Sequence, residues 1–459
     1  MFEHEGTVST GLHGVVRGDT DEWARMSGRG FWRRTKDSVV ARNTVIQVAN
    51  QGLSIGTGLV TFAMSTRALG ADAYGAFGLA TTYAAFVAII LDAGLDTHIV
   101  NDLAVAGEAS PRSAKAHRLV SEAAVLRCGL WLVATGGAMA IGALGEYEPL
   151  VMVGVALLSV SALVGAVGML VADVYQAALD VRIAVLGSFL TRMASVGLIS
   201  GLYLVHLLSV ESLLIVTLIS GVAGFGAVLA IAMHQGFAFQ RVSVRGSLRL
   251  YSATASLAIW VILGQVVYRA DVVVLSLVRL HPSLGLTNQR AVGIYVAAYK
   301  FFDLSIGLPQ FIVISLMPRL ARFAASDLGA YSAYLRRWLV RMGAMGTSVG
   351  LAFAAIGGSA LGLIAGPSFA RSEPIVAILA GAMPFAFLTS LLFAAIVAIG
   401  ARMRLVVFYL AVALFNVGAN IILTPEWGYW AAAWLTTLCQ AILAIGMAAI
   451  LWRAMERTS

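Results

Sequence analysis

Charge is scarce in this sequence: only 12% of its 459 residues are Asp, Glu, Lys or Arg, and lysine occurs at just three positions. So little charge, combined with 59% hydrophobic residues and a mean hydropathy of +0.87, excludes a large aqueous domain. The two cysteines, Cys128 and Cys439, lie in apolar stretches without a paired spacing, which argues against disulfides and metal sites. A glycine-rich phosphate-binding loop is also missing from the sequence, so direct use of ATP is not expected.

Apolar stretches of about 20 residues, the length of a helix that crosses a bilayer, recur along nearly the whole chain. We therefore predict an all-α polytopic membrane protein with about twelve transmembrane helices. The predicted spans are Val39–Met64, Gly75–Leu95, Leu119–Leu144, Leu150–Val174, Ile183–Leu207, Leu213–Met233, Ser252–Val278, Ala291–Met317, Val340–Ile364, Ile375–Ile399, Leu405–Leu423 and Trp430–Leu451.

Arginine is concentrated in every second connection between these spans. Basic residues beside short connections stay on the cytoplasmic side, so the pattern predicts that both chain ends are cytoplasmic. This distribution, with anionic lipid head groups as the partner, explains the net charge of +8, and nucleic acid is not a predicted partner. The basic residues expected at the cytoplasmic side between spans are Arg112, Lys115, Arg118, Arg182, Arg241, Arg245, Arg249, Arg319, Arg322, Arg336, Arg337, Arg341, Arg402 and Arg404.

A short repeat divides the chain into two halves. The segment 75–80 opens the second span and the segment 293–298 opens the eighth, and a Leu-Ala pair follows each at a similar interval. The repeat predicts two six-helix lobes related by a pseudo-two-fold axis along the membrane normal, V-shaped with a central cavity. Chance likeness among small apolar residues is the alternative.

The same pattern predicts the order of domains. It is a disordered cytoplasmic arm (1–38), an N-terminal lobe (39–234), a basic cytoplasmic linker (235–249), a C-terminal lobe (250–452) and a cytoplasmic tail (453–459). The arm contains no short apolar core followed by a small-residue cleavage site, so we expect no removable signal peptide.

Four cations interrupt the apolar spans: Arg127, Arg192, Arg269 and Lys300. A charge at the centre of a membrane helix costs about 2.5–3.5 kcal/mol on insertion scales, so such residues face protein or a watery cavity. If all four face the central cavity, they form a ladder for an anionic head group, which arginine matches with two parallel hydrogen bonds. Alternatively, each charge belongs to a buried ion pair that only fixes helix packing.

Uncharged polar side chains recur at helical spacing on several spans and predict which faces line the cavity. Lys300 lies three residues before Asp303 and is expected to pair with it. The predicted substrate-binding residues, besides the four cations, are Gln47, Asn50, Gln51, Gln265, Tyr268, Tyr295, Tyr299, Asn416 and Asn420.

At several places the chain resembles the oligosaccharide flippases of the polysaccharide-export (Wzx-like) type. These belong to the multidrug/oligosaccharidyl-lipid/polysaccharide (MOP) transporter superfamily, which also holds the multidrug and toxin extruders. The resemblance covers nearly everything after the arm. It is carried by Arg67-Ala68-Leu69-Gly70 with Tyr74-Gly75, Asp92-Ala93-Gly94-Leu95, Arg269-Ala270-Asp271, Gly293-Ile294-Tyr295, Pro318-Arg319-Leu320-Ala321, and Asn416, Asn420, Pro425 and Gly428.

The resemblance implies a transporter, and not an enzyme, in the bacterial inner membrane. It would move a polyprenyl-pyrophosphate-linked oligosaccharide from the cytoplasmic to the outer leaflet by alternating access. No cofactor is implied beyond H⁺ or Na⁺ as a coupling ion. Asp271 and Asp303 are the candidate coupling groups, because a carboxylate near a cation can exchange that partner for a proton or sodium. A glycan polymerase or other export machinery is the implied protein partner.

Two other functions compete with this interpretation. A multidrug exporter related to the toxin extruders would share the architecture, but it should carry unpaired carboxylates in its cavity, and here cations dominate. A membrane enzyme acting on the same lipid-linked sugars, or another partner in an export complex, would normally have a large outer loop with catalytic carboxylates or histidines. The outer connections here are short, and His281 and His206 are their histidines.

Overall fold

The computed structural model describes residues 39–400 and 402–456, so the predicted arm at 1–38 lies outside the described residues. All regular elements in the described ranges are helices, as predicted. They are α2 (Val39–Asp92), α3 (Leu95–Ala106), α4 (Ala114–Leu144), α5 (Pro149–Ala177), α6 (Arg182–Leu204), α7 (Val210–His234), α8 (Val244–Leu277), η1 (Pro282–Leu284), α9 (Asn288–Ser326), α10 (Leu328–Ala352), the π-helical turn η2 (Phe353–Gly357), α11 (Gly358–Ala365), η3 (Pro367–Ser372), α12 (Glu373–Ala380), α13 (Met383–Ala398), α14 (Arg402–Trp427) and α15 (Tyr429–Glu456).

Each predicted span falls on one of these helices or on two or three consecutive ones. Among the described residues, nine helices are long and apolar enough to cross a membrane, and the bent pair α12 and α13 makes a tenth. The first of the nine contains a sharp bend at Gly70, whose φ of 70° breaks α2 into two arms. The 34-residue α8 is a further long helix outside that count. If the two arms of α2 are counted as two spans and α8 is added, the number agrees with the roughly twelve spans predicted from the sequence.

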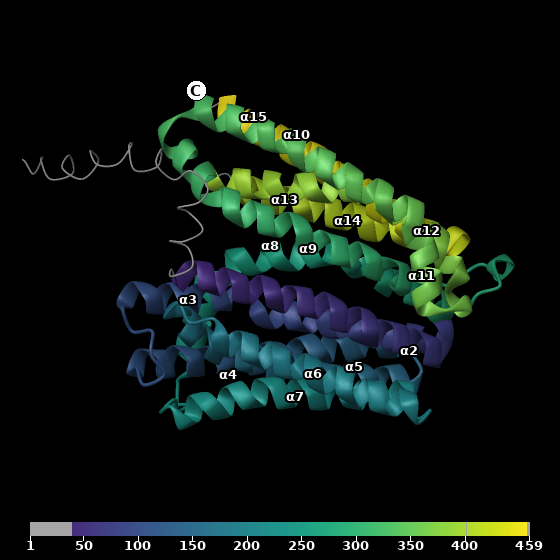
Figure 1. Ribbon diagram of the computed structural model, residues 1–459, viewed down its shortest axis with the longest axis horizontal. Coiled ribbons are helices and arrows are strands. Elements are labelled where there is room, and N and C mark those ends of the chain that lie inside the picture. The colour runs from purple at the N-terminus through teal and green to yellow at the C-terminus, as the bar shows by residue number, and fades with distance from the viewer. Residues whose placement is uncertain (1–38, 401, 457–459) are drawn as a thin grey trace, which may run out of the picture.

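The two halves of the chain form two lobes (Figure 1). Helices α2 to α7 make the lower lobe of this view, and α8 to α15 make the upper one. The lobes lie closest at the right, where α2 bends near α11, and they spread toward the left, where α2 begins and the chain ends. We call the right side the closed end and the left side the open end.

The buried core shows the same V shape. One apolar cluster contains residues from both lobes, including Tyr74 and Leu79 of α2 and Tyr295 of α9. A second cluster, around Tyr331, lies wholly in the C-terminal lobe. A third, around Leu103, lies in the N-terminal lobe except for Leu250 from the first turns of α8. The lobes therefore share a core at the closed end and have separate cores toward the open end.

Two glycines bring the lobes into backbone contact at the closed end. A Cβ atom added to Gly75 would lie 1.9 Å from the Gln289 carbonyl oxygen, and one added to Gly293 would lie 1.9 Å from the Ala71 carbonyl oxygen. Only glycine allows two helices to approach so closely. These glycines are the first residues of the two repeat segments, so the repeat units meet each other directly.

Polar contacts surround this glycine pair. Arg67 donates from Nε to the Ile364 carbonyl at 3.0 Å, near the C-terminus of α11, where a cation also favours the helix dipole. Thr287 donates to the Asp72 carboxylate at 2.8 Å. Both contacts join α2 to the C-terminal lobe and help to hold the closed end shut.

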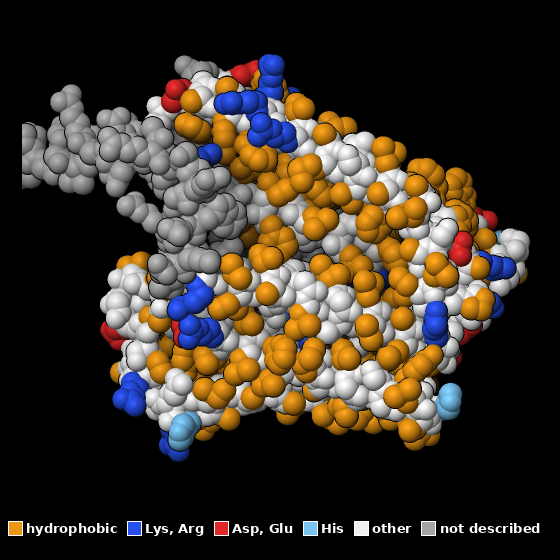
Figure 2. All heavy atoms as spheres, viewed as in Figure 1, with side chains coloured by type: hydrophobic (Ala, Val, Ile, Leu, Met, Phe, Trp, Pro, Cys, Tyr) orange, Lys and Arg blue, Asp and Glu red, His pale blue; other side chains and the backbone are white. Residues whose placement is uncertain are grey.

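The outer surface is suited to lipid. Hydrophobic side chains cover the long flanks of both lobes in Figure 2, while basic and acidic side chains gather mainly toward the two ends. Large apolar side chains such as Val133, Leu363 and Ile422 are more than two-thirds exposed. Such an apolar band between polar ends is typical of a protein that spans a bilayer.

Candidate functional site

The N-terminal lobe contains one of the predicted cations, Arg192, beside the first half of α2. This side chain, half-buried on α6, donates from Nη1 to the Asn50 Oδ1 atom of α2 at 2.7 Å. Asn50 in turn donates to the Ser188 hydroxyl at 3.3 Å. Among the described residues Arg192 forms no ion pair, so its charge is balanced only by an amide and remains available to an anion.

The C-terminal lobe contains a second cation, Arg269 of α8. Its Nη2 atom lies 2.9 Å from Asp303 of α9, and the two side chains are 28% and 30% exposed. The guanidinium also stacks over the Tyr299 ring at 5.9 Å. The predicted Lys300–Asp303 pair is therefore replaced by Arg269–Asp303. Lys300 is half-buried and forms no ion pair within the described ranges.

Gln51 of α2 lies beside α9 of the C-terminal lobe. Its Nε2 atom lies 3.8 Å from the position of a Cβ added to Gly307, which is one helical turn beyond Asp303 on α9. Asp303 itself lies ten residues from the Gly293 contact, or about 15 Å along the helix, toward the open end. Lys300 precedes Asp303 on α9, Arg269 pairs with Asp303, and Arg192 binds Asn50, the neighbour of Gln51, so all three cations lie on the open side of the closed-end contact. That they face the space between the lobes stays a prediction.

Asp271, by contrast, lies inside the C-terminal lobe. It is 0% exposed and accepts hydrogen bonds from the Val272 amide at 2.8 Å, the Thr436 hydroxyl at 2.9 Å and the Tyr295 hydroxyl. Three donors satisfy the carboxylate, so it joins α8, α9 and α15. Tyr295 is also fully buried, and Tyr299 donates to the Tyr268 carbonyl at 2.6 Å.

Two other predicted cavity residues are also internal. Asn416 and Asn420 of α14 are each 0% exposed. Asn416 contacts the Cys439 sulfur of α15 at 3.3 Å, and Asn420 donates to the Asn416 carbonyl at 2.9 Å. The prediction that Asn416 and Asn420 line the cavity is therefore wrong. A polar stripe on a membrane helix faces away from lipid, but in this lobe it faces a neighbouring helix and not the cavity. Tyr295, which was also predicted to line the cavity, requires the same correction.

The remaining polar predictions lie at the surface or near it. Gln47 is exposed on α2, and Gln265 and Tyr268 are half-buried on α8. These three positions are compatible with the space between the lobes, and their role in binding stays a prediction.

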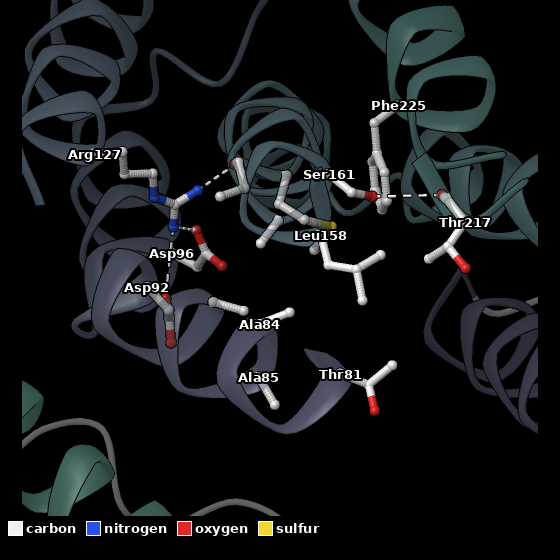
Figure 3. Close-up of a pocket in the computed structure, with 15 residues that line it drawn as sticks. Thr81, Ala84, Ala85, Asp92, Asp96, Arg127, Leu158, Ser161, Thr217 and Phe225 are labelled. Carbon is white, nitrogen blue, oxygen red and sulfur yellow. Dashed lines mark hydrogen bonds and ion pairs between the residues drawn. The ribbon is translucent and has the colours of Figure 1, made fainter. Parts of the chain in front are cut away.

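Arg127 lies in a separate place, the interior of the N-terminal lobe. It is 1% exposed and donates to the Leu91 carbonyl at 3.0 Å and to the Ala166 carbonyl. Its Nη2 atom pairs with Asp96 and lies 3.6 Å from Asp92 (Figure 3). Arg127 is therefore not part of the predicted ladder of cations, because it faces carboxylates of its own lobe. A ladder of the other three cations stays a prediction.

A cavity of about 490 Å³ adjoins this charge cluster. Its walls come from α2, α3, α4, α5 and α7. Asp96 and the nearby Asp173 of α5 were missed as site residues. The signal was present, because Asp173 is a carboxylate inside an apolar span, and the rule that selected the cations applies equally to acids.

Comparison with known proteins identifies relatives of this fold. A family model described as polysaccharide biosynthesis protein matches residues 40–324. No match was found among proteins with curated functions.

Among solved structures, an inward-facing multidrug resistance MATE family transporter of the MOP superfamily has a TM-score of 0.68 at 13% identity, with 88% of this chain and 95% of that chain covered. The lipid II flippase MurJ, in an inward closed conformation, has a TM-score of 0.64 at 14% identity, covering 88% and 86%. An outward-facing MATE family transporter has a TM-score of 0.60 at 14% identity, covering 93% and 98%. At these identities the likeness shows the fold, which is that of the MOP-superfamily transporters.

Proposed function

Since this chain belongs to the polysaccharide biosynthesis protein family, we propose that it is a secondary transporter, and not an enzyme, that flips a polyprenyl-pyrophosphate-linked oligosaccharide across the membrane. The cargo moves from the cytoplasmic to the outer leaflet. The observation that supports this proposal best is the set of partly exposed cations in both lobes, on the open side of the closed-end contact: Arg192, Arg269 and Lys300.

These cations suit a pyrophosphate. A phosphate charge about 4 Å from one cation gains about 4 kcal/mol at an effective dielectric near 20, which offsets part of its dehydration. Arg192 and Lys300 have no carboxylate partner among the described residues, so they can bind an anion without breaking an ion pair. The head group enters between the lobes, while the prenyl tail stays in the surrounding lipid.

Transport follows from rocking of the two lobes. The open end corresponds to the cytoplasm if both termini are cytoplasmic in a bacterial inner membrane, as the arginine distribution predicts. Cargo must bind the two conformations with different affinity, because equal affinity shifts no population. Asp303, 30% exposed and paired with Arg269, is placed to exchange that partner for cargo or a coupling ion. Asp271, held by three donors, acts on this exchange through Tyr295 and Tyr299.

Complementation of a bacterial strain that lacks its own glycan flippase tests this function. Arg192→Ala, Arg269→Ala and Lys300→Ala are each expected to slow the appearance of surface glycan about tenfold or more, because a lost charged contact costs about 1.5–3 kcal/mol. Lipid-linked precursor should accumulate inside. The measured quantities are surface glycan and precursor per molecule of membrane-inserted protein.

The matched control is Arg279→Ala, which removes an exposed cation at the closed end, outside the proposed binding region. It should export at the wild-type rate. If Arg192→Ala, Arg269→Ala and Lys300→Ala all export glycan at the wild-type rate and at equal protein levels, these cations do not bind the cargo. The proposal of an anionic, pyrophosphate-linked cargo would then be rejected.

A further inference from the structure

Helices α10, α13 and α15 of the C-terminal lobe form a groove of about 500 Å³. The groove lies at the open end, because the last two turns of α15 line it and the chain ends there. Helix α13 packs against both α10 and α15. Its Leu392, together with Leu335 of α10 and Leu451 of α15, belongs to the buried core of this lobe, and each of the three is at most 3% exposed. The floor of the groove is therefore apolar.

The two rims of the groove carry different side chains. On α10, Ser332 and Arg336 lie one helical turn apart, and Arg337 follows directly. On α15, Ala448 and Trp452 lie one turn apart. Both arginines are exposed, and Trp452 is 61% exposed. The apolar floor is thus bordered by two cations on one side and by an aromatic ring on the other.

The charge around this groove is mostly positive. The charged residues of α10, α13 and α15 are one acid, Glu456, and four arginines, Arg336, Arg337, Arg341 and Arg453. None of the four arginines forms an ion pair within the part of the chain that the structure describes. Basic side chains gather at the upper left of Figure 2, where Figure 1 places α10 and α15. A ligand that complements the groove is therefore anionic at one end and apolar at the other.

We infer that this groove binds one anionic phospholipid from the bilayer leaflet at the open end. Its phosphodiester lies against Arg336 and Arg337, because a guanidinium matches phosphate oxygens, and one acyl chain lies along the leucine floor. Trp452 lies on the opposite rim, at the head-group level that amphipathic rings prefer. All walls of the groove belong to one lobe, whereas the proposed cargo moves between two. The occupant is therefore a membrane phospholipid, and its site does not depend on the proposed function.

Native mass spectrometry of the full-length protein in detergent tests the site with two probes, phosphatidylglycerol and phosphatidylethanolamine of the same acyl chains. Arg336→Gln/Arg337→Gln should bind phosphatidylglycerol about thirtyfold more weakly than wild type, which converts to about 1 kcal/mol for each arginine. Its affinity for phosphatidylethanolamine, which has no net charge, should not change. The matched control is Arg319→Gln/Arg322→Gln, which removes two exposed arginines of α9 outside the groove and should bind as wild type does. Equal affinity of the two double variants for phosphatidylglycerol would overturn the site.

A further variant, Ala448→Phe, separates the groove from its charge. The added ring fills the groove beside Trp452 and leaves every arginine in place. With thermal unfolding used to verify that it is folded, this variant should bind phosphatidylglycerol at least tenfold more weakly than wild type. Wild-type affinity would mean that the lipid contacts only surface arginines, and the groove would be rejected as its site. Polyprenyl pyrophosphate is the competitor: if it binds wild type more tightly and displaces phosphatidylglycerol, the groove belongs to the cargo lipid and the inferred occupant is wrong.

Discussion

Replacement of Arg127 with alanine is expected to destabilise the N-terminal lobe by about 3–5 kcal/mol, the usual cost of removing one partner from a buried ion pair. The variant leaves Asp92 and Asp96 without their cation in an apolar surrounding. It also removes the donors to the Leu91 and Ala166 carbonyls, which tie α2 and α5 to α4. Thermal unfolding of detergent-purified protein measures this loss as a lower midpoint temperature.

Two further variants separate charge from packing at Arg127. Arg192→Ala is the matched control, because it removes a half-buried arginine that bonds one amide, and its midpoint should stay near that of wild type. Arg127→Met combined with Asp96→Asn removes the cation and one of its acids together, and should recover much of the lost stability. An Arg127→Ala protein that unfolds with the wild-type midpoint but fails to flip substrate would return Arg127 to a direct role in binding.

The helical fold was predictable because lipid imposes a simple condition on sequence. Each span needs about 20 apolar residues, so apolar stretches in the sequence predicted where the long helices of the described residues lie. Between the first two predicted spans the sequence indicated a connection at residues 65–74, whereas the structure has a bend at Gly70 within the continuous helix α2. The family resemblance, which rested on short motifs, is confirmed by the match over residues 40–324.

The candidate site was harder to predict, because a polar stripe does not reveal which protein surface it faces. Arg127 and Arg192 lie at similar distances from the cytoplasmic ends of their predicted spans. In the structure, however, Arg127 pairs with Asp96 inside its lobe, whereas Arg192 bonds only Asn50. The difference depends on Asp96, which lies in α3, a short helix between two spans. The three-residue spacing also predicted an ion pair between Lys300 and Asp303. In the structure Asp303 instead pairs with Arg269 of the neighbouring α8.

The sequence repeat predicted which positions of the two lobes are equivalent, but it did not predict that these positions are in contact. Gly75 and Gly293 were predicted to be equivalent positions in two lobes, and the structure shows that these equivalent residues touch. A contact between equivalent positions is expected where the predicted pseudo-two-fold axis passes. The small residues of the repeat are therefore needed for the closed end to shut, and they should control which end of the transporter is open.

Gly293→Ala is accordingly expected to shift the protein toward a conformation with the closed end open. The added Cβ would lie 1.9 Å from the Ala71 carbonyl oxygen, far inside the contact distance, and separation of the lobes removes the clash. Overpacking of this kind costs about 1–3 kcal/mol, which changes the ratio of the two conformations by about five-fold to more than a hundred-fold. Spin labels on Leu207→Cys and Arg279→Cys, with both native cysteines replaced, would report the shift as a longer distance at that end.

The control for this shift is a glycine of α2 that touches nothing. Gly58 has no atom within 4 Å of an added Cβ, so Gly58→Ala changes helix propensity alone and should leave the label distance unchanged. Gly75→Ala should reproduce the effect of Gly293→Ala, because its Cβ would meet the Gln289 carbonyl from the opposite lobe. If either repeat glycine accepts alanine with the wild-type distance and stability, the helices can separate locally at low cost. In that case the closed end is held by the surrounding Arg67 and Asp72 contacts, and the glycine pair does not control opening.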